Sequence, residues 1–502
     1  MTEPSPFPAE FGPPDAIGRG PRTGHVSTSP DLVADAVISP PLRERMQRGD
    51  GPIGIVIELR VRYPGGAPAA AEQVVKGLLP DVRAGAPHQV NGSYVTTALN
   101  AEEIRRLVRA DREGADAGTS PTETVRADRG AIYRIWPNFG ITALITRSII
   151  TTKCQAVHRS FNATGRDIVW AVVDSGIDGD HPHFKQHKNL VGLPHRSFVD
   201  DDDALALRDD AGHGTHVAGI LAGEQAAEPG RTLSGAVWYQ DDAGVIQARE
   251  TAFPSICGMA PECKLLSCKV LRADESGDIT ALLAALQYIA GLNEGGRDLQ
   301  VHGVNISVGH PFDPSWFATG LTPVCREVDN LVRSGVVVVV AAGNTGYGYA
   351  GDRENQLMRV GFDMTINDPG NAALAITVGS TSSSPHSTGI SYFSSKGPTG
   401  DGRMKPDIVA PGERVISAAA GALLVKARSV SPDATYIENS GTSMAAPHVS
   451  GAAAAFLSVH REFAGQPDAV SKALLSTATD LGRARTFQGA GLVDAMRAIQ
   501  SV

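Results

Sequence analysis

The stretch GTSMAAPH, residues 441–448, places one serine in a turn of small residues, directly before a long Ala-rich run. The run predicts a helix over residues 443–457, so Ser443 lies where the first N–H groups of a helix are unpaired and the helix dipole is positive. Both features stabilise an oxygen that carries negative charge during acyl transfer. A serine in this place is also typical of a helix cap. A nucleophilic role therefore requires a base and an orienting carboxylate elsewhere in the chain.

Two further motifs supply these groups. VVDSGID, residues 172–178, ends an apolar strand at Asp174, and GHGTHVAG, residues 212–219, opens a helix at His213. A hydroxyl nucleophile at neutral pH needs an imidazole to take its proton, and the imidazole needs a carboxylate to fix its tautomer. The chain carries these groups in the order Asp174, His213, Ser443.

These motifs, in this order, resemble the subtilisin-like serine peptidase family, the subtilases. The resemblance extends from about residue 153 to about residue 498. It implies that Asp174 is the orienting carboxylate, that His213 is the general base and acid, and that Ser443 is the nucleophile.

The resemblance also covers VAAGN, residues 340–344. It implies that the Asn344 side chain donates to the oxyanion together with the backbone N–H of Ser443. Taken alone, an asparagine after a strand is typical of a turn. His216 shares a helix face with His213. Since the family's base is the first histidine of the motif, we expect His216 to be a packed residue.

Two segments resemble the family's substrate-binding elements. NISVG, residues 305–309, resembles the strand that flanks the primary specificity pocket, and ADESG, residues 273–277, resembles the opposite rim. An extended peptide would add between them as a strand. The implied substrate-binding residues are Ser307, Val308, Gly309, Ala273 and Gly277. Asp274 and Glu275 hint at tolerance for basic side chains, while residues 347–364 have no family match and leave the preference at the cleaved bond open.

Continuous apolar strands alternate with helical patterns from residue 167 onward, which predicts a parallel sheet covered on both faces. The expected strands cover residues 167–173, 264–271, 303–308, 335–341 and 374–379, and the expected helices cover residues 213–222, 280–292, 324–334 and 443–457. The predicted fold class is α/β, the three-layer subtilisin-like fold with a mostly parallel central sheet. Because ligands bind at the carboxyl ends of such strands, we expect the site residues to converge there.

The chain divides into a flexible leader at residues 1–50, a propeptide-like α+β domain at residues 51–140 and a subtilisin-like peptidase domain at residues 141–502. In the second part we expect strands at residues 53–61, 93–99 and 131–135, helices at residues 69–78 and 101–110, and a polar loop at residues 113–129. This order is similar to the inhibitory propeptides of the family. The similarity implies a domain that assists folding and inhibits its own peptidase until cleavage near residues 138–151. An unrelated accessory domain remains the alternative.

Composition is that of an ordinary globular enzyme. The 45 basic and 54 acidic residues among 502 give a net charge of −9, which offers no footprint for nucleic acid. No apolar stretch reaches the ~18 residues of a membrane span, and the N-terminus lacks the pattern of a secretory signal. The five cysteines match neither a zinc site nor a disulfide framework. We expect a cytoplasmic protein that acts on proteins or peptides and has no membrane or nucleic-acid partner, with export by another route left open.

The sequence predicts no cofactor. His181, His183, His187 and His195 suggest a metal site, but no second cluster of ligands accompanies them. Many relatives hold a structural calcium with an Asp after His-Pro, and here that position is His183, a poor calcium ligand. The acidic run at residues 200–203, with Asp209 and Asp210 behind it, favours a solvated loop over a cation site.

The sequence therefore predicts a serine endopeptidase that forms an acyl-enzyme at Ser443. One alternative is a catalytically silent relative that binds peptides, against which the complete set of motifs argues. The other is an esterase-type hydrolase, but such enzymes carry G-x-S-x-G with the histidine after the serine. Here the turn is GTSMA and the histidine comes first.

Overall fold

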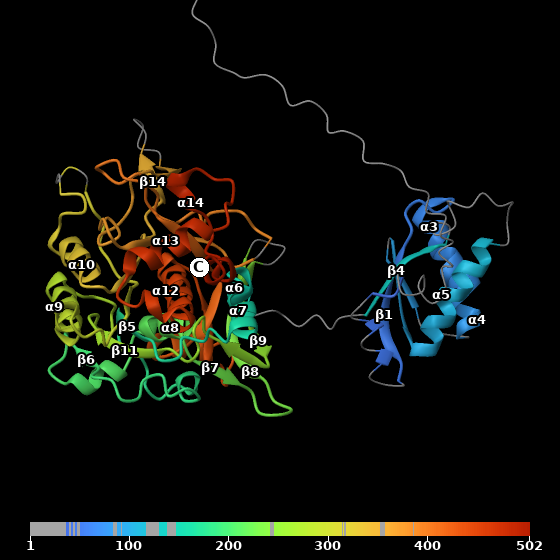
Figure 1. The fold of residues 1–502 in the computed structure, drawn as a ribbon, viewed down its shortest axis with the longest axis horizontal. Coiled ribbons are helices and arrows are strands. Elements are labelled where there is room, and N and C mark those ends of the chain that lie inside the picture. Colours follow the sequence, from blue (N-terminus) through green and yellow to red (C-terminus); the bar gives the residue numbers. More distant parts are fainter. Residues whose placement is uncertain are drawn as a thin grey trace, which may run out of the picture. The chain divides into compact units, whose positions relative to one another are not determined.

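A computed structural model of the chain describes residues 37–39, 42–43, 46–47, 51–83, 88–91, 93–116, 130–137, 147–240, 245–313, 315, 318–351, 357–384 and 386–502. The chain divides into two compact units, Met1–Ile141 and Thr142–Val502, each with its own hydrophobic core (Figure 1). The division falls beside the boundary expected at residue 140.

The N-terminal unit is built on a four-stranded antiparallel sheet in the order β2-β3-β1-β4. Its strands are β1 (Ile53–Leu59), β2 (His88–Asn91), β3 (Tyr94–Leu99) and β4 (Ile132–Pro137). The helical segments, which lie on one face of the sheet in Figure 1, are α3 (Gly66–Glu72), η1 (Gln73–Leu78), α4 (Leu79–Val82) and α5 (Ala101–Asp116). Alternate residues of β1, such as Ile55 and Ile57, are buried in the core between sheet and helices.

Two elements of this unit differ from the sequence-based expectation. Strand β2 was not anticipated, because its four residues, HQVN, are mostly polar and show no apolar alternation. Helix α5 continues to Asp116, past the expected end at residue 110 and into the expected loop. The remainder of that loop, residues 117–129, lies outside the described residues.

Part of the predicted leader belongs to the core of this unit. The residues concerned are Val37, Ile38, Leu42 and Met46. Next to them, the N–H of Ser39 donates to the carbonyl of Ile135 at 3.0 Å. The N-terminal domain therefore begins before residue 51, and the residues of the leader other than 37–39, 42–43 and 46–47 lie outside the described part of the chain.

The C-terminal unit contains a seven-stranded sheet in the order β17-β16-β13-β12-β5-β11-β6, in which neighbouring strands are parallel. The strands are β5 (Val169–Asp174), β6 (Arg196–Ser197), β11 (Lys264–Lys269), β12 (Gly303–Ile306), β13 (Val337–Ala341), β16 (Ile376–Ser382) and β17 (Ile408–Glu413). The predicted α/β class with a parallel sheet is confirmed, although β6 and β17 were not anticipated.

Helices cover both faces of this sheet. They are α8 (His213–Leu221) and α12 (Thr442–Val459) on one face, and α9 (Ile279–Leu292) and α10 (Pro323–Arg333) on the other. Successive residues of β13 alternate between the two layers, since Val339 packs in the core of α8 and α12 and Val340 packs in the core of α9 and α10. Burial on both faces explains why the strand is an unbroken run of valines.

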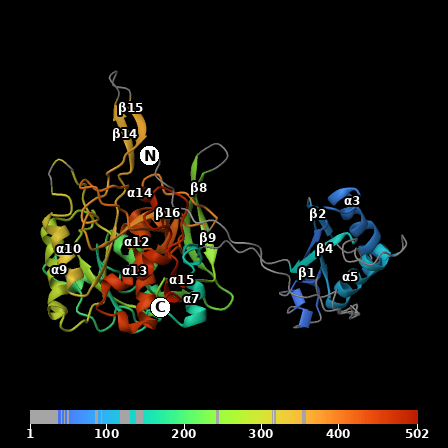
Figure 2. The same cartoon turned by 45° about the horizontal axis from the view of Figure 1, so that its top comes forward.

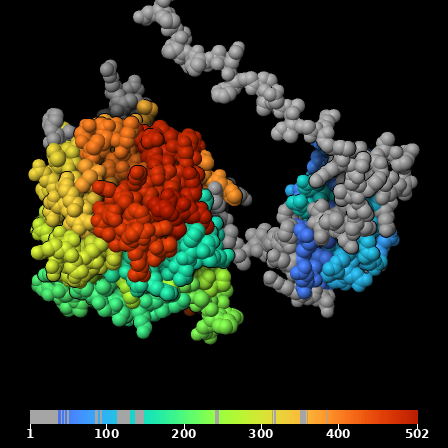
Figure 3. Space-filling view, viewed as in Figure 1, coloured from blue at the N-terminus to red at the C-terminus, as the bar shows by residue number. Residues whose placement is uncertain are grey.

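Short helices close the ends of this unit. They are α6 (Arg147–Thr151) and α7 (Cys154–Phe161) at its beginning, and α13 (Pro467–Thr477), α14 (Arg485–Gln488) and α15 (Ala495–Ile499) at its end. Helices α13 and α15 pack against α12, and α7 packs against α15. Figure 3 shows this C-terminal part of the chain, in red, on the surface of the unit.

Smaller elements extend from this framework. A second sheet has the order β18-β19-β8-β9 and consists of β8 (Leu233–Gln240), β9 (Ile246–Phe253), β18 (Val415–Ala418) and β19 (Tyr436–Asn439). In addition, β7 (Glu224–Ala226) pairs with β10 (Ser255–Cys257), and β14 (Tyr347–Gly351) pairs with β15 (Leu357–Gly361). The remaining helices are η3 (Pro182–Phe184), η4 (Asp203–Leu207), η5 (Glu294–Gly296), α11 (Gly421–Arg428) and η7 (Arg461–Phe463). Figure 2 shows the β8–β9 and β14–β15 hairpins projecting from the unit. None of the helices in the described residues combines the length and apolar composition that crossing a membrane requires.

Candidate active site

Asp174 and His213 meet at the carboxyl end of the central sheet. Asp174 is the last residue of β5, and His213 is the first residue of α8. The Nδ1–H of His213 donates to Oδ1 of Asp174 at 2.7 Å, and the Asp174 side chain is fully buried. This bond requires the proton on Nδ1 and leaves Nε2 of the neutral ring free to accept a proton.

Two glycines allow α8 to approach β5 this closely. Gly212, with φ of +95°, adopts the left-handed conformation that favours glycine, and a Cβ there would lie 2.2 Å from the carbonyl oxygen of Ala420. A Cβ on Gly214 would lie 2.2 Å from the carbonyl oxygen of Gly176. A larger residue at either position would displace the start of α8, and His213 with it.

A buried carboxylate that sequence reasoning missed, Asp209, holds the N-terminus of α8. It accepts N–H bonds from Gly212 at 2.7 Å and Thr215 at 2.8 Å, and hydroxyl bonds from Thr215 at 2.7 Å and Ser175 at 2.8 Å. Burial raises the pKa of Asp209 above its ordinary value, although these hydrogen bonds oppose the shift. The expectation of a solvated loop is wrong for this residue. An acid just before a helix is a capping signal that could have identified it.

The charges around His213 raise the pKa of its imidazole. Burial alone would lower that pKa, but the Asp174 carboxylate outweighs it through its charge and hydrogen bond, and Glu275 and Asp209 add negative potential. The pKa of His213 therefore lies above the ordinary histidine value. A stronger base is what proton removal from a hydroxyl requires.

Ser443 is the second residue of α12, at the N-terminus of that helix as expected. Its hydroxyl donates to the carbonyl of Ser307 at 3.0 Å, and the Ser307 hydroxyl donates to the carbonyl of Ser443 at 2.9 Å. His213 and Ser443 line the same cleft, but the serine hydroxyl uses Ser307 as its acceptor in this structure. Catalytic hydrogen bonds are often loose or absent without substrate, and a rotation about Cα–Cβ would free this hydroxyl.

Thr442 orients the side chain of Asn344, which also lines the cleft. The Oδ1 of Asn344 accepts from the N–H of Thr442 at 2.9 Å and from its hydroxyl at 3.0 Å. The same hydroxyl accepts from the N–H of Gly343 at 3.1 Å. Because Oδ1 is occupied, the Nδ2 donor of Asn344 is the group left to face a ligand. Sequence reasoning missed Thr442, since a threonine before Ser443 looks like an ordinary cap.

The cleft next to Ser443 has a volume of about 440 Å³. Residues of the 305–309 segment line it as predicted, namely Ser307, Val308 and Gly309. Asn367 and Thr345 line it as well, and the Thr345 hydroxyl donates to Oδ1 of Asn367 at 3.0 Å. No sequence signal had singled out Asn367. This part of the cleft is polar and carries no charge.

On the opposite rim, the residues that line the cleft are not all the ones that the sequence predicted. Leu271 and Glu275 line it, whereas Ala273 and Gly277 do not and are exposed to solvent. Gly277 packs against its own turn, since a Cβ there would lie 2.6 Å from the carbonyl oxygen of Val270. Leu271 and Glu275 are therefore the residues of this side that line the cleft, and the assignment of Ala273 and Gly277 as substrate-binding residues stays a prediction.

Comparisons with known proteins agree with this geometry. Residues 165–492 match the model of the subtilase family. The chain belongs to the subtilase family. Serine protease AprX of Bacillus subtilis (strain 168) is 29% identical over 399 residues, which cover 77% of this chain and 78% of that protein. Subtilisin E of the same organism is 31% identical over 348 residues, which cover 69% of each.

A third relative is the major intracellular serine protease of Bacillus subtilis (strain 168), 31% identical over 302 residues that cover 59% of this chain and 70% of that protein. The family resemblance and the serine endopeptidase class expected from the three motifs are confirmed. The family match begins at residue 165, so it does not extend to the N-terminal domain.

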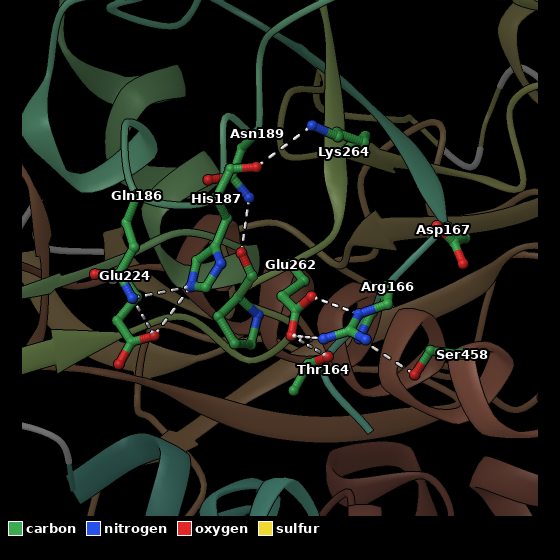
Figure 4. Close-up of polar contacts among 12 residues, drawn as sticks. Thr164, Arg166, Asp167, Gln186, His187, Asn189, Glu224, Glu262, Lys264 and Ser458 are labelled. Atoms are coloured by element: carbon green, nitrogen blue, oxygen red, sulfur yellow. Dashed lines mark hydrogen bonds and ion pairs between the residues drawn. The ribbon is translucent and has the colours of Figure 1, made fainter. Parts of the chain in front are cut away.

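The histidines that suggested a metal site in this subtilase have separate protein partners. Figure 4 shows His187, whose Nε2–H donates to Glu224 at 3.0 Å. His195 donates from Nε2 to the carbonyl of Leu190 at 2.7 Å and accepts at Nδ1 from the N–H of Ser267 at 3.0 Å. Among the residues that the structure describes, no group of three or more His, Cys, Asp and Glu side chains is placed to hold a metal ion.

His183 does not fit the calcium site known from many subtilases. Its Nε2–H donates to the carbonyls of Gly219 at 3.1 Å and Ala222 at 3.0 Å, at the C-terminal end of α8, and its ring packs edge-on against Tyr436. Burial lowers the pKa of His183 to about 3, so the imidazole is neutral. Calcium requires oxygen ligands, and the imidazole of His183 supplies none.

The acidic run at residues 200–203 also has protein partners. Asp200 accepts from the hydroxyl of Ser197 at 2.9 Å, and Asp202 caps η4 by accepting from the N–H of Ala204 at 2.9 Å. These contacts give two of its carboxylates a structural role in the loop.

Proposed function

We propose that this subtilase hydrolyses peptide bonds in proteins and peptides through an acyl-enzyme on Ser443. The supporting observation is the 2.7 Å bond from His213 to the buried Asp174, in a cleft that Ser443 lines. This arrangement supplies a base of raised pKa next to a hydroxyl at a helix N-terminus.

In the proposed reaction, Nε2 of His213 takes the proton of Ser443 as Oγ bonds to the carbonyl carbon of the substrate. The tetrahedral intermediate collapses, the C–N bond breaks, and His213 gives the proton to the departing amine. Water then attacks the ester on Ser443 with the same proton transfers and releases the acid. Asp174 keeps the imidazole in the correct tautomer and stabilises its charged form.

The proposed oxyanion donors are the Nδ2–H group of Asn344 and the backbone N–H of Ser443. Thr442 supports this role, because it occupies Oδ1 of Asn344 and leaves the donor end toward the cleft. A neutral donor held in this way needs no reorganisation when negative charge develops.

The test uses the purified chain, its Ser443→Ala form and, as a matched control, Ser440→Ala, which changes another serine lining the cleft. We expect a fluorophosphonate probe to label the wild type and the control but not Ser443→Ala, and casein to be cleaved in the same pattern. Absence of labelling after removal of the N-terminal domain would contradict the proposal. Labelling with cleavage of esters but not of casein would favour an esterase.

We further propose that the N-terminal domain is an intramolecular inhibitor that is removed by self-cleavage. It has its own sheet, helices and core, and it precedes the peptidase unit in the chain. The expected junction at residues 138–151 narrows in the light of helix α6, in which Ile149 and Thr151 are buried. A protease needs an extended, accessible segment, so we place the junction before the first residue of α6, Arg147.

Mass spectrometry of the wild type and of Ser443→Ala tests this second proposal. We expect the wild type to yield a mature chain that begins within residues 139–147, and Ser443→Ala to remain at full length. An uncut wild type that is active on casein would show that the domain is a retained accessory domain instead.

We also propose that the neutral imidazole of His183, and not a calcium ion, stabilises the C-terminal end of α8. Its two bonds to the carbonyls of Gly219 and Ala222 support this. The melting temperature of Ser443→Ala should therefore be the same in EDTA as in millimolar calcium. His183→Asp, which restores an oxygen ligand, serves as the comparison. A lower melting temperature in EDTA for the chain with His183 would contradict the proposal.

A further inference from the structure

One acidic side chain lines the cleft among the residues that the structure describes. Of these lining residues, only His213 and Glu275 carry an acidic or basic side chain. Glu275 is exposed to solvent, and its carboxylate forms no hydrogen bond or ion pair with the residues that the structure describes. It is therefore available to pair with a charge that a ligand brings into the cleft.

The neighbouring acid, Asp274, is used within its own turn. Its Oδ1 accepts from the N–H of Ser276 at 3.0 Å, and the N–H of Glu275 donates to the carbonyl of Arg272 at 3.0 Å. Glu275 has φ of +60°, in the left-handed region that an L-residue rarely adopts. Asp274 does not line the cleft. The turn thus presents Glu275, and not Asp274, to a bound substrate.

The charge of Glu275 reaches the catalytic histidine. Its carboxylate is among the groups that raise the pKa of His213, together with Asp174 and Asp209. Asp174 is bonded to His213, and Asp209 is bonded to the start of α8. Of these three acids, only Glu275 lines the cleft, which it shares with His213 and Leu271.

This inference rests on the proposed function and on the family resemblance of residues 305–309. By that resemblance, the first side chain on the acyl side of the cleaved bond enters the uncharged part of the cleft lined by Ser307, Val308 and Gly309. Successive side chains of an extended chain point in opposite directions. The second side chain on the acyl side therefore points away from that pocket, and we place it toward His213, Leu271 and Glu275, which line the same cleft.

We propose that Glu275 forms a subsite for a basic side chain, lysine or arginine, at the second acyl-side residue of the substrate. The apolar stem of such a side chain lies along Leu271, and its charged end meets the carboxylate. The negative charge also offsets the repulsion between a basic substrate residue and the imidazolium that forms on His213 during acyl transfer. Asp274 makes no contribution to this preference.

The test compares two tetrapeptide amides that carry the same leaving group and differ only in lysine or glutamine at the second acyl-side residue. The enzymes are the mature wild type, Glu275→Gln and the matched control Asp274→Asn. In the wild type we expect kcat/KM to favour the lysine peptide by about two- to fivefold at low salt, the scale of a solvent-exposed ion pair, with the ratio falling as salt rises. Glu275→Gln should bring the ratio close to unity, and Asp274→Asn should keep it.

A preference that persists in Glu275→Gln, that disappears in Asp274→Asn, or that is absent from the wild type would overturn this inference. Cleavage of the glutamine peptide by the wild type, and its loss in Ser443→Ala, tests the proposed peptidase function independently of the subsite. If the wild type cleaves both peptides equally, the subsite fails while the peptidase stands. If it cleaves neither, the proposed function and the subsite fail together. Lysine moved to the first acyl-side residue should show no dependence on Glu275.

Discussion

Two carboxylate–histidine pairs in this subtilase have similar distances and different surroundings. His213 donates to Asp174 at 2.7 Å, and His187 donates to Glu224 at 3.0 Å. The side chains of the first pair are 17% and 0% exposed, and those of the second are 21% and 32% exposed. The difference lies in the carboxylate, which is shielded from water in one pair and solvated in the other.

The two pairs also lie in different places in the fold. Asp174 ends a central strand, His213 begins a helix, and both meet in the cleft that contains Ser443. Glu224 begins the short strand β7, and His187 lies in a loop beside it (Figure 4). A hydrogen-bonded acid and imidazole thus occur in two different settings in this structure. A buried acid and a cleft shared with Ser443 distinguish the first pair.

The largest expected effect separates the two histidines directly. His213→Ala should lower kcat on a peptide substrate on the order of 10⁶-fold, the loss quoted for the serine or histidine of subtilisin's own triad. His187→Ala should change kcat/KM by no more than about twofold, as expected of a surface substitution. Steady-state kinetics of both variants, measured after a second protease has removed the N-terminal domain from each, gives the answer. A comparable loss in the two variants would remove the contrast.

A smaller effect is expected for the oxyanion donor. Asn344→Ala should lower kcat on the order of 10²–10³-fold with little change in KM, the cost quoted for the corresponding donor of subtilisin. Thr442→Val removes one of the two bonds that orient Asn344 and keeps the backbone bond, so we expect a loss in kcat of about tenfold. An increase in KM with kcat unchanged would assign these residues to ground-state binding instead.

The pH dependence of activity should depend on the Asp174–His213 pair and not on the Glu224–His187 pair. Catalysis needs neutral His213, whose pKa is raised, so kcat/KM should increase with pH and reach half its maximum above pH 6.5. Glu275→Gln removes negative potential and should move this midpoint to lower pH. Glu224→Gln, at the other pair, should leave it in place. A midpoint at or below pH 6.5 in the wild type would contradict the electrostatic account of His213.

The smallest effect concerns stability at the second pair. Glu224→Gln in the Ser443→Ala background should change the free energy of unfolding by less than about 1 kcal/mol, because the pair is partly solvated. Asn189→Ala, in the same close-up (Figure 4), should cost about 1–3 kcal/mol, since it deprives the buried carbonyls of Pro261 and Cys263 of their donor. Urea unfolding measures both, and equal costs would mean that burial does not set the difference.

Sequence reasoning reached the residues that we propose as catalytic and missed residues that hold them in place. Asp174, His213 and Ser443 stand in motifs where residue type and local structure agree. Thr442 contacts Asn344 across 98 positions of the chain, and its role became visible only when β13 and α12 were placed together. Asp209 was interpreted with a run of acids as solvated, whereas the fold buries it at the start of α8.

By itself, the sequence determined the class of enzyme, the parallel α/β sheet and the residues proposed as its triad. These follow from local patterns, because buried strands are continuously apolar and helix starts favour particular residues. The cytoplasmic location stays a prediction. The tertiary structure decided that Leu271 and Glu275, and not Ala273 and Gly277, face the cleft, and that His183 bonds the end of α8. Such choices depend on which atoms distant segments bring together, and a linear pattern does not contain those distances.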